Sequence, residues 1–186
     1  MNDPAFDRVE TEVRAAHDDA ATAPTDNGGL SRASDANSHT HVAISVLPRD
    51  AIRLGQRATS KEEAITMAGQ VLIDEGAADD VYVKGMIARE KQISTYMGEG
   101  VAIPHGVDEV RDHIDKATLG FLQFPEGVEW DGNICTVVIP IASSSDEHLE
   151  IMAALARILS NPETARQLRE ATCTDEVLNL LGSQQA

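Results

Sequence analysis

His105 lies between Pro104 and Gly106 in the segment Gly-Val-Ala-Ile-Pro-His-Gly, which spans residues 100–106. Pro104 fixes its own backbone angle and biases the preceding residue toward an extended conformation, and Gly106 removes side-chain bulk beside the imidazole. The reference pKa of about 6.5 leaves much of a histidine neutral near neutral pH, so its unprotonated ring nitrogen can attack phosphorus without a separate base. The segment therefore predicts a rigidly held, accessible histidine that is able to carry a phosphoryl group as a covalent intermediate.

Two further side chains could stabilise a phosphoryl group on His105. His148 follows the segment Ser-Ser-Asp-Glu of residues 144–147, which has the pattern of a capping box. Its ring is therefore expected beside free backbone amides at the positive end of a helix. Arg89 is expected near the end of another helix, from which its guanidinium could bind phosphoryl oxygens. We predict a site of His105, His148 and Arg89, with His105 as the nucleophile and no metal or organic cofactor.

Each of these residues also has a simpler interpretation. A histidine between Pro and Gly is often only a turn residue, a histidine one turn into a helix is usually exposed, and Arg89 can interact with the negative end of its own helix. In a different class of protein, a non-catalytic binding module, His105 and His148 would coordinate a metal ion. Zinc sites usually need three or four ligands, and the sequence offers no evident third one, so we expect no metal site.

The charge of the chain limits the partners that it can bind. It has 31 acidic and 15 basic residues and a net charge of −16. The excess extends along the whole chain, with 8 acidic and 3 basic residues in residues 1–41 and 23 and 12 in the remainder. Such acidity disfavours binding to nucleic acids and other polyanions. The composition also resembles that of proteins adapted to high intracellular salt, where screening weakens self-repulsion, so halophilic adaptation is a hypothesis.

The sequence has no recognisable membrane-spanning or secretory segment. Its longest apolar stretch, residues 136–142, is interrupted by Pro140 and is far shorter than the roughly 20 apolar residues of a membrane-spanning helix. The first residues, Met-Asn-Asp-Pro, lack a basic segment followed by an apolar one. Cys135 and Cys173 have no metal-binding or CxxC spacing. We therefore expect a cytoplasmic protein that is not inserted into the membrane.

The pattern of the chain predicts a single α/β domain between two tails. Residues 1–41 are rich in Ala, Asp, Thr, Asn, Ser and Gly and are predicted to form a disordered acidic N-terminal tail. Residues 42–182 alternate between strand-like and helix-like patterns without an internal repeat, which is typical of an α/β fold. Residues 183–186 are assigned to a C-terminal tail.

Helix and strand signals alternate within the predicted domain. A first helix is expected from a cap at Ser60 to a stop at Gly76, and a second over residues 79–91. Asn161-Pro162 and Thr174-Asp175 are typical helix starts. β-Type residues predict strand regions over residues 94–103, 116–124 and 135–142, the last of them at or near the centre of the sheet. Pro140 must then lie where no backbone donor is needed.

A longer segment that includes His105 resembles a known family. Residues 86–106 read Met-Ile-Ala-Arg-Glu-Lys-Gln-Ile-Ser-Thr-Tyr-Met-Gly-Glu-Gly-Val-Ala-Ile-Pro-His-Gly, and they closely resemble the type-2 IIA domain (EIIA) of the phosphotransferase system (PTS), the fructose and mannitol family. The resemblance continues through residues 120–130, 137–142, 147–148 and 174–178. A match of several segments in the family's order is more specific than one motif. It covers nearly all of residues 43–182 and implies a mixed β-sheet flanked by helices on both faces.

The resemblance implies a role for each candidate residue. In this family the histidine that matches His105 takes a phosphoryl group from phospho-HPr on Nε2 and passes it to a cysteine of the IIB component, during uptake of a sugar of the fructose/mannitol class. The residue that matches His148 helps to hold the phosphoryl group, and the arginine that matches Arg89 belongs to the same pocket. The implied protein is a phosphotransferase that associates with the membrane permease through IIB and IIC. Residues 1–41 match nothing in the domain.

A regulatory member of the nitrogen-related branch of this family is the alternative, because that branch shares Ile-Pro-His-Gly. In such a protein the phosphorylation state controls protein partners instead of sugar uptake. The segments Phe124–Trp130 and Asp146–His148 are more similar to the mannitol and fructose members. They favour a role in transport.

Overall fold

The structure, a computed structural model, describes residues 46–143 and 145–182. The two predicted tails lie outside the described residues, and so does Ser144, the first residue of the predicted capping box. The tail boundaries and this cap therefore stay predictions. Within the described ranges, no helix is both long and apolar enough to cross a membrane.

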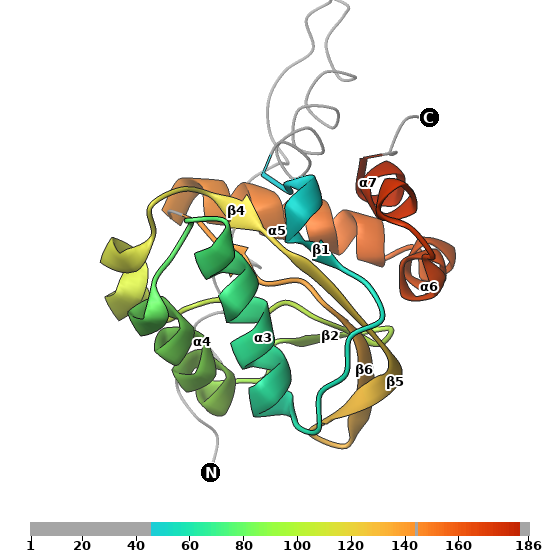
Figure 1. Cartoon of the computed structure of the whole chain (residues 1–186), viewed down its shortest axis with the longest axis horizontal. Helices are drawn as coiled ribbons and strands as arrows, with labels where there is room; N and C mark the ends of the chain where they lie inside the picture. The colour runs from blue at the N-terminus through green and yellow to red at the C-terminus, as the bar shows by residue number, and fades with distance from the viewer. Residues whose placement is uncertain (1–45, 144, 183–186) are drawn as a thin grey trace, which may run out of the picture. The chain divides into compact units, whose positions relative to one another are not determined.

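Helices flank both faces of a mixed β-sheet, as the resemblance implied. In Figure 1, α3 (Lys61–Asp74) and α4 (Asp80–Gln92) lie in front of the strands, and α5 (Ser145–Leu159) lies behind them. The remaining helical segments are η1 (Arg49–Ala51), η2 (Asp108–His113), α6 (Pro162–Glu170) and α7 (Thr174–Gly182). The predicted α/β class is confirmed.

The main sheet has five strands in the order β1-β5-β6-β3-β2. They are β1 (Ile52–Arg53), β2 (Tyr96–Gly98), β3 (Val101–Ala102), β5 (Phe121–Trp130) and β6 (Asn133–Val138). The pairs β1·β5 and β3·β6 are parallel, whereas β5·β6 and β2·β3 are antiparallel. A second, antiparallel pair joins β4 (Thr118–Leu119) to β7 (Ile141–Ala142). Because β6 is the middle strand, the prediction of a central strand in this region is confirmed.

The strand predicted over residues 135–142 was wrong in its extent. β6 begins earlier, at Asn133, and ends at Val138, and β7 starts only at Ile141. Pro140 lies in the break between them, where its missing N–H leaves no gap in a ladder. Its carbonyl oxygen accepts a hydrogen bond from Gly120 N at 3.0 Å.

The other two predicted strand regions are also divided. Residues 94–103 form the hairpin of β2 and β3, and residues 116–124 contain β4 and the start of β5. β5 then continues to Trp130, well beyond the predicted end. The register of its pairing with β6 shifts between Gln123 and Val128. Pro125 therefore lies in an irregular part of the ladder, where a missing N–H is tolerated.

The helix signals located four helices correctly. Ser60 caps α3 by accepting a hydrogen bond from Glu63 N at 3.2 Å, and Gly76 follows the helix with a φ of 62°. Asp79 caps α4 through the amides of the first helical turn. Asn161 caps α6 in the same way, and α7 begins at the predicted Thr174. Short polar side chains before α3, α4 and α6 explain why these three starts can be recognised.

Gly85 interrupts the sequence of α4 for a packing reason. A Cβ atom at this position would come within 2.4 Å of Val110 Cγ2 in η2. The glycine therefore lets η2, which follows His105 closely in the chain, lie directly against α4. The core beneath includes Phe121, Phe124 and Trp130 of β5, which are almost completely buried.

Candidate functional site

His105 is fixed to the sheet by backbone and side-chain hydrogen bonds. It forms an isolated parallel bridge with Ile141, and Ile141 N donates to Pro104 O at 3.0 Å. The ring atom Nδ1 lies 2.9 Å from the carbonyl oxygen of Ile103. Because a carbonyl oxygen can only accept a hydrogen bond, Nδ1 carries the proton of the neutral ring. Nε2 keeps its lone pair and is the nucleophilic nitrogen.

The surroundings of His105 favour the neutral imidazole. Burial lowers its pKa below the ordinary value, the hydrogen bond to the Ile103 carbonyl opposes this shift, and the positive charge of Arg89 lowers the pKa further. The form with a free lone pair is therefore well populated at neutral pH.

Tyr82 holds the backbone that follows His105. Its hydroxyl accepts a hydrogen bond from Gly106 N at 3.0 Å and donates one to Ile141 O at 2.6 Å. A Cβ atom on residue 106 would lie 2.5 Å from Tyr82 Cε2, so a glycine is needed for this close approach. The sequence did not indicate this role of Tyr82, because nothing in a local pattern predicts a hydrogen bond to a strand so distant in the chain.

His148 lies beside His105, as predicted. The two ring centroids are 4.9 Å apart, and the ring planes are inclined by 56°. His148 is the fourth residue of α5, and its Nδ1 lies 3.0 Å from the Ser143 hydroxyl oxygen. Burial, the neighbouring His105 and the charge of Arg111 lower the pKa of His148 to about 4. His148 is therefore a neutral hydrogen-bonding group at physiological pH, and not a cation.

Arg89 lies in the last turn of α4, at the C-terminal end of the helix and at the pocket. Its Nη1 donates to the carbonyl oxygen of Ile93, the C-cap of its own helix, at 2.8 Å. The same side chain also lines the pocket that contains His105 and His148. The structure thus brings the three predicted site residues together from three distant segments.

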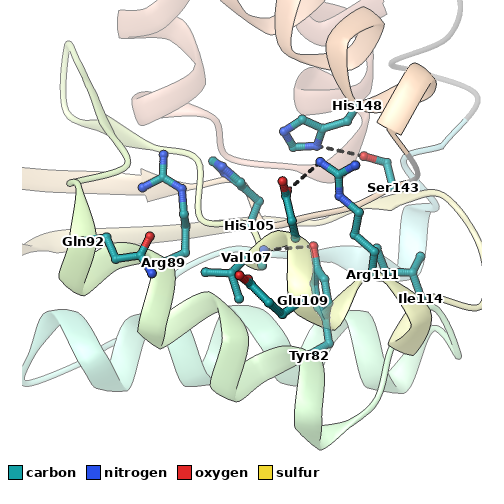
Figure 2. Close-up of a pocket in the computed structure, with 12 residues that line it drawn as sticks. Tyr82, Arg89, Gln92, His105, Val107, Glu109, Arg111, Ile114, Ser143 and His148 are labelled. Carbon is teal, nitrogen blue, oxygen red and sulfur yellow. Dashed lines mark hydrogen bonds and ion pairs between the residues drawn. The ribbon is translucent and has the colours of Figure 1, made fainter. Parts of the chain in front are cut away.

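The pocket has a volume of about 290 Å³ and contains a second arginine that the sequence had not indicated (Figure 2). Arg111 of η2 lines it opposite Arg89 and forms an ion pair with Asp108 at 2.7 Å. Two guanidinium groups in the pocket of His105 can bind an anionic phosphoryl group. Within the described part of the chain, no group of three or more His, Cys, Asp or Glu side chains is placed to hold a metal ion.

Glu90 connects α4 to the strands that carry the site. Its buried carboxylate accepts hydrogen bonds from Trp130 Nε1 at 2.8 Å and from Thr95 N at 2.8 Å. The Thr95 carbonyl oxygen in turn accepts from Ile103 N at 3.0 Å, and the Ile103 carbonyl accepts from His105 Nδ1. A continuous series of hydrogen bonds therefore connects the end of α4 to the imidazole ring. The sequence had given no role to Glu90, since a charged residue at a helix end is usually exposed.

The fold and the site together define a class of protein. The sequence profile of the phosphoenolpyruvate-dependent sugar phosphotransferase system, EIIA 2, matches residues 45–184. Because this match covers most of the chain, the protein belongs to the PTS EIIA type-2 family. The resemblance noted in the sequence is confirmed.

Individual relatives agree with this assignment. A multiphosphoryl transfer protein of Escherichia coli O157:H7 is 46% identical over 131 residues, which are 70% of this chain and 35% of that protein. The chain thus spans about a third of the length of this relative. A mannitol-specific phosphotransferase enzyme IIA component of Staphylococcus aureus (strain Mu50 / ATCC 700699) is 41% identical over 128 residues, 69% of this chain and 89% of that protein.

A solved structure shares the fold. It is a complex of enzyme IIAMTL and phosphorylated enzyme IIBMTL from Escherichia coli, and the match has a TM-score of 0.68 and 38% identity. It covers 73% of this chain and 96% of the matched chain.

Proposed function

We propose that this protein is the IIA component of a sugar phosphotransferase system and that His105 carries the phosphoryl group. Phospho-HPr, a phosphohistidine carrier, is the donor, and a cysteine of the cognate IIB component is the acceptor. The observation that carries the proposal is the contact of His105 Nδ1 with the Ile103 carbonyl, which leaves the Nε2 lone pair directed at a pocket with two arginines.

Each transfer exchanges one bond to phosphorus for another. In the first step the Nε2–P bond forms as the P–N bond of the donor breaks, and the donor imidazole leaves. In the second step the IIB thiolate forms an S–P bond as the Nε2–P bond of His105 breaks. Such a reaction depends mainly on positioning and charge stabilisation, and Arg89, Arg111 and His148 are the groups available for them. The proton stays on Nδ1 throughout, hydrogen-bonded to the Ile103 carbonyl oxygen.

The transported sugar is proposed to belong to the fructose/mannitol class. The support is the similarity of Phe124–Trp130 and Asp146–His148 to those members, together with the relatives named above. A cytoplasmic location and an association with the permease through IIB and IIC belong to the same proposal.

Phosphorylation by the purified general components tests the role of His105. The protein is incubated with phosphoenolpyruvate, enzyme I and HPr, and its intact mass is measured under alkaline conditions that preserve phosphohistidine. Wild type should gain one phosphoryl group, and His105→Ala should gain none. His148→Ala should still be phosphorylated but should transfer the group poorly to IIB. The matched control is His113→Ala, since His113 lies outside the pocket and bonds to Asp79. If the wild-type protein gains no phosphoryl group in this assay, the proposal is disproved.

The regulatory alternative predicts a different second step. A nitrogen-related IIA protein would accept the phosphoryl group on His105 but would not pass it to a IIB protein of the mannitol or fructose type. Adding such a IIB domain to the phosphorylated protein therefore separates the two functions. Loss of the phosphoryl mass from His105 together with its gain on the IIB cysteine supports transport.

A further inference from the structure

Ser143 makes a contact with His148 for which the catalytic roles above give no reason. Its hydroxyl oxygen lies 3.0 Å from His148 Nδ1, and a dashed line marks this contact in Figure 2. The serine follows β7 directly and is buried, with a relative exposure of 4%. The contact thus anchors one side of the His148 ring to the end of a strand.

The direction of this hydrogen bond follows from the burial of Ser143. A buried hydroxyl hydrogen needs an acceptor, whereas an unused lone pair on the oxygen is tolerated more easily. Within the described residues, His148 Nδ1 is the hydrogen-bond partner found for the Ser143 hydroxyl. Ser143 therefore donates its hydrogen to Nδ1. A neutral imidazole carries a single N–H, so the proton of His148 lies on Nε2.

The two histidines then present opposite functions to the same pocket. His105 donates from Nδ1 to a carbonyl oxygen and offers the lone pair of Nε2, whereas His148 accepts at Nδ1 and offers an N–H at Nε2. Once His105 is phosphorylated, its phosphoryl oxygens are acceptors. A neighbouring Nε2–H stabilises them, and a lone pair in its place would repel them.

We propose that Ser143 is a positioning residue that selects the Nε2–H tautomer of His148, so that this N–H donates a hydrogen bond to a phosphoryl oxygen on His105. The inference rests on the proposed function of His105. Ser143 itself does not touch the phosphoryl group and acts only through His148. The site thereby includes a second layer, Ser143, which has no obvious signature in the sequence.

The tautomer of His148 can be measured before any phosphorylation. Long-range ¹H–¹⁵N NMR correlations distinguish a protonated from an unprotonated ring nitrogen. In wild type, Nδ1 should be unprotonated and Nε2 protonated. Ser143→Ala should give a mixture of both tautomers, and Ser143→Thr, which keeps the hydroxyl, should restore the wild-type form. A proton on Nδ1 of His148 in wild type would overturn the proposal, whatever the outcome of the phosphorylation assay.

The transfer step tests whether the tautomer matters for function. Ser143→Ala should be phosphorylated on His105 but should transfer the group to IIB roughly tenfold more slowly, less than the ~100-fold expected for loss of a whole donor in His148→Ala. In the His148→Ala background, Ser143→Ala should have no further effect, because it acts through His148. A further loss of transfer rate in the double variant would show that Ser143 does not act through His148 and has a merely structural role.

A matched control and the donor step keep the two proposals apart. Ser160→Ala removes a hydroxyl that donates to the Arg157 carbonyl at 2.7 Å. Ser160 follows the C-terminal end of α5, whereas His148 lies in its first turn, so this change should alter neither tautomer nor rate. If wild type is not phosphorylated by HPr, the proposed function fails while the tautomer measurement still stands. If wild type is phosphorylated and Ser143→Ala matches it in tautomer and in rate, only the role of Ser143 fails.

Discussion

The chemistry of His105 is determined by the atom that contacts its Nδ1. A carbonyl oxygen forces the proton onto Nδ1 and leaves Nε2 nucleophilic, so no separate base is required. Burial and the charge of Arg89 act in the same direction, since both disfavour the imidazolium ion. The ring is thus already in the protonation state that the proposed phosphoryl transfer requires, before any partner binds.

We expect phosphoryl uptake by His105 to decline only at a lower pH than it would for a histidine with the ordinary pKa of about 6.5. The reason is that the neutral form is the nucleophile, and the lowered pKa extends this form to more acidic pH. An NMR titration of the ring gives the midpoint, and single-turnover uptake from phospho-HPr gives the rate. A midpoint at or above about 6.5 would contradict this expectation.

The sequence indicated some site residues and missed others for a physical reason. His105 could be recognised because Pro104 and Gly106 restrict the adjacent backbone, so the signal is local. Tyr82 and Arg111 could not, because their roles depend on contacts made only after distant segments have packed together. Arg89, His105 and His148 were predicted to share a site, but spacing alone could not show that they would meet.

The end of α4 joins the folding of the domain to the geometry of the site. Glu90 is buried there and accepts hydrogen bonds from β5 and from the segment that enters β2. Lys61 at the start of α3 lies 3.4 Å from the same carboxylate and offsets its charge. A buried, fully bonded carboxylate fixes these elements relative to one another, because each of its donors would otherwise be unpaired.

Replacing this carboxylate by an amide should weaken both the fold and the transfer. In Glu90→Gln the amide group cannot accept from Trp130 Nε1 and Thr95 N together, so one buried N–H loses its acceptor. We expect a loss of about 1–3 kcal/mol in the free energy of unfolding, measured by urea titration. Transfer to IIB should also slow at a temperature where the variant is folded, because Thr95 helps to fix the strand before His105.

The matched control for this prediction is Glu62→Gln. Glu62 lies on the exposed face of α3, and its ion pair with Lys91 is long and solvent-accessible. The same substitution there should change the free energy of unfolding by less than about 0.5 kcal/mol. Equal effects at the two positions would mean that the hydrogen bonds of Glu90 contribute little.

At the level of elements, the sequence predicted helices better than strands. Helix starts have local signals, such as Ser60, Asp79 and Asn161, whose side chains bond to amides two or three residues away. Strand ends depend on partners elsewhere in the chain. The break at Pro140 and the extension of β5 to Trp130 follow from pairing with neighbours, which an alternation of residue types does not reveal.

The pocket does not share the strong acidity of the whole molecule. The chain has a net charge of −16, whereas in the lining of the pocket that is proposed to hold an anionic phosphoryl group Arg89 and Arg111 balance Asp108 and Glu109. Long-range repulsion of free anions and short-range binding of a transferred phosphoryl group can coexist, because the first is screened by salt and the second is not. The total charge could be read from the sequence, but the sequence could not show that the two arginines would gather in the pocket while most of the acidic residues lie elsewhere.

The acidic surface predicts that salt stabilises the protein. Raising KCl from about 0.1 M to about 1 M shortens the Debye length from about 10 Å to about 3 Å, and this weakens repulsion between exposed carboxylates. We expect the midpoint of thermal unfolding to rise by about 5 °C, which corresponds to roughly 1 kcal/mol for a domain of this size. Differential scanning calorimetry over this range of KCl measures the shift.

Neutralising part of this surface should weaken the dependence on salt. The exposed residues Asp112, Asp115 and Glu150 can be replaced together by Asn, Asn and Gln, which keeps size and polarity but removes three negative charges. If repulsion between carboxylates causes the salt effect, the variant should unfold at a higher temperature than wild type at low KCl and should gain less from added salt. An equal shift in both proteins would assign the effect to salt acting on apolar burial, and an unfolding temperature of wild type that does not depend on KCl would disprove the halophilic hypothesis.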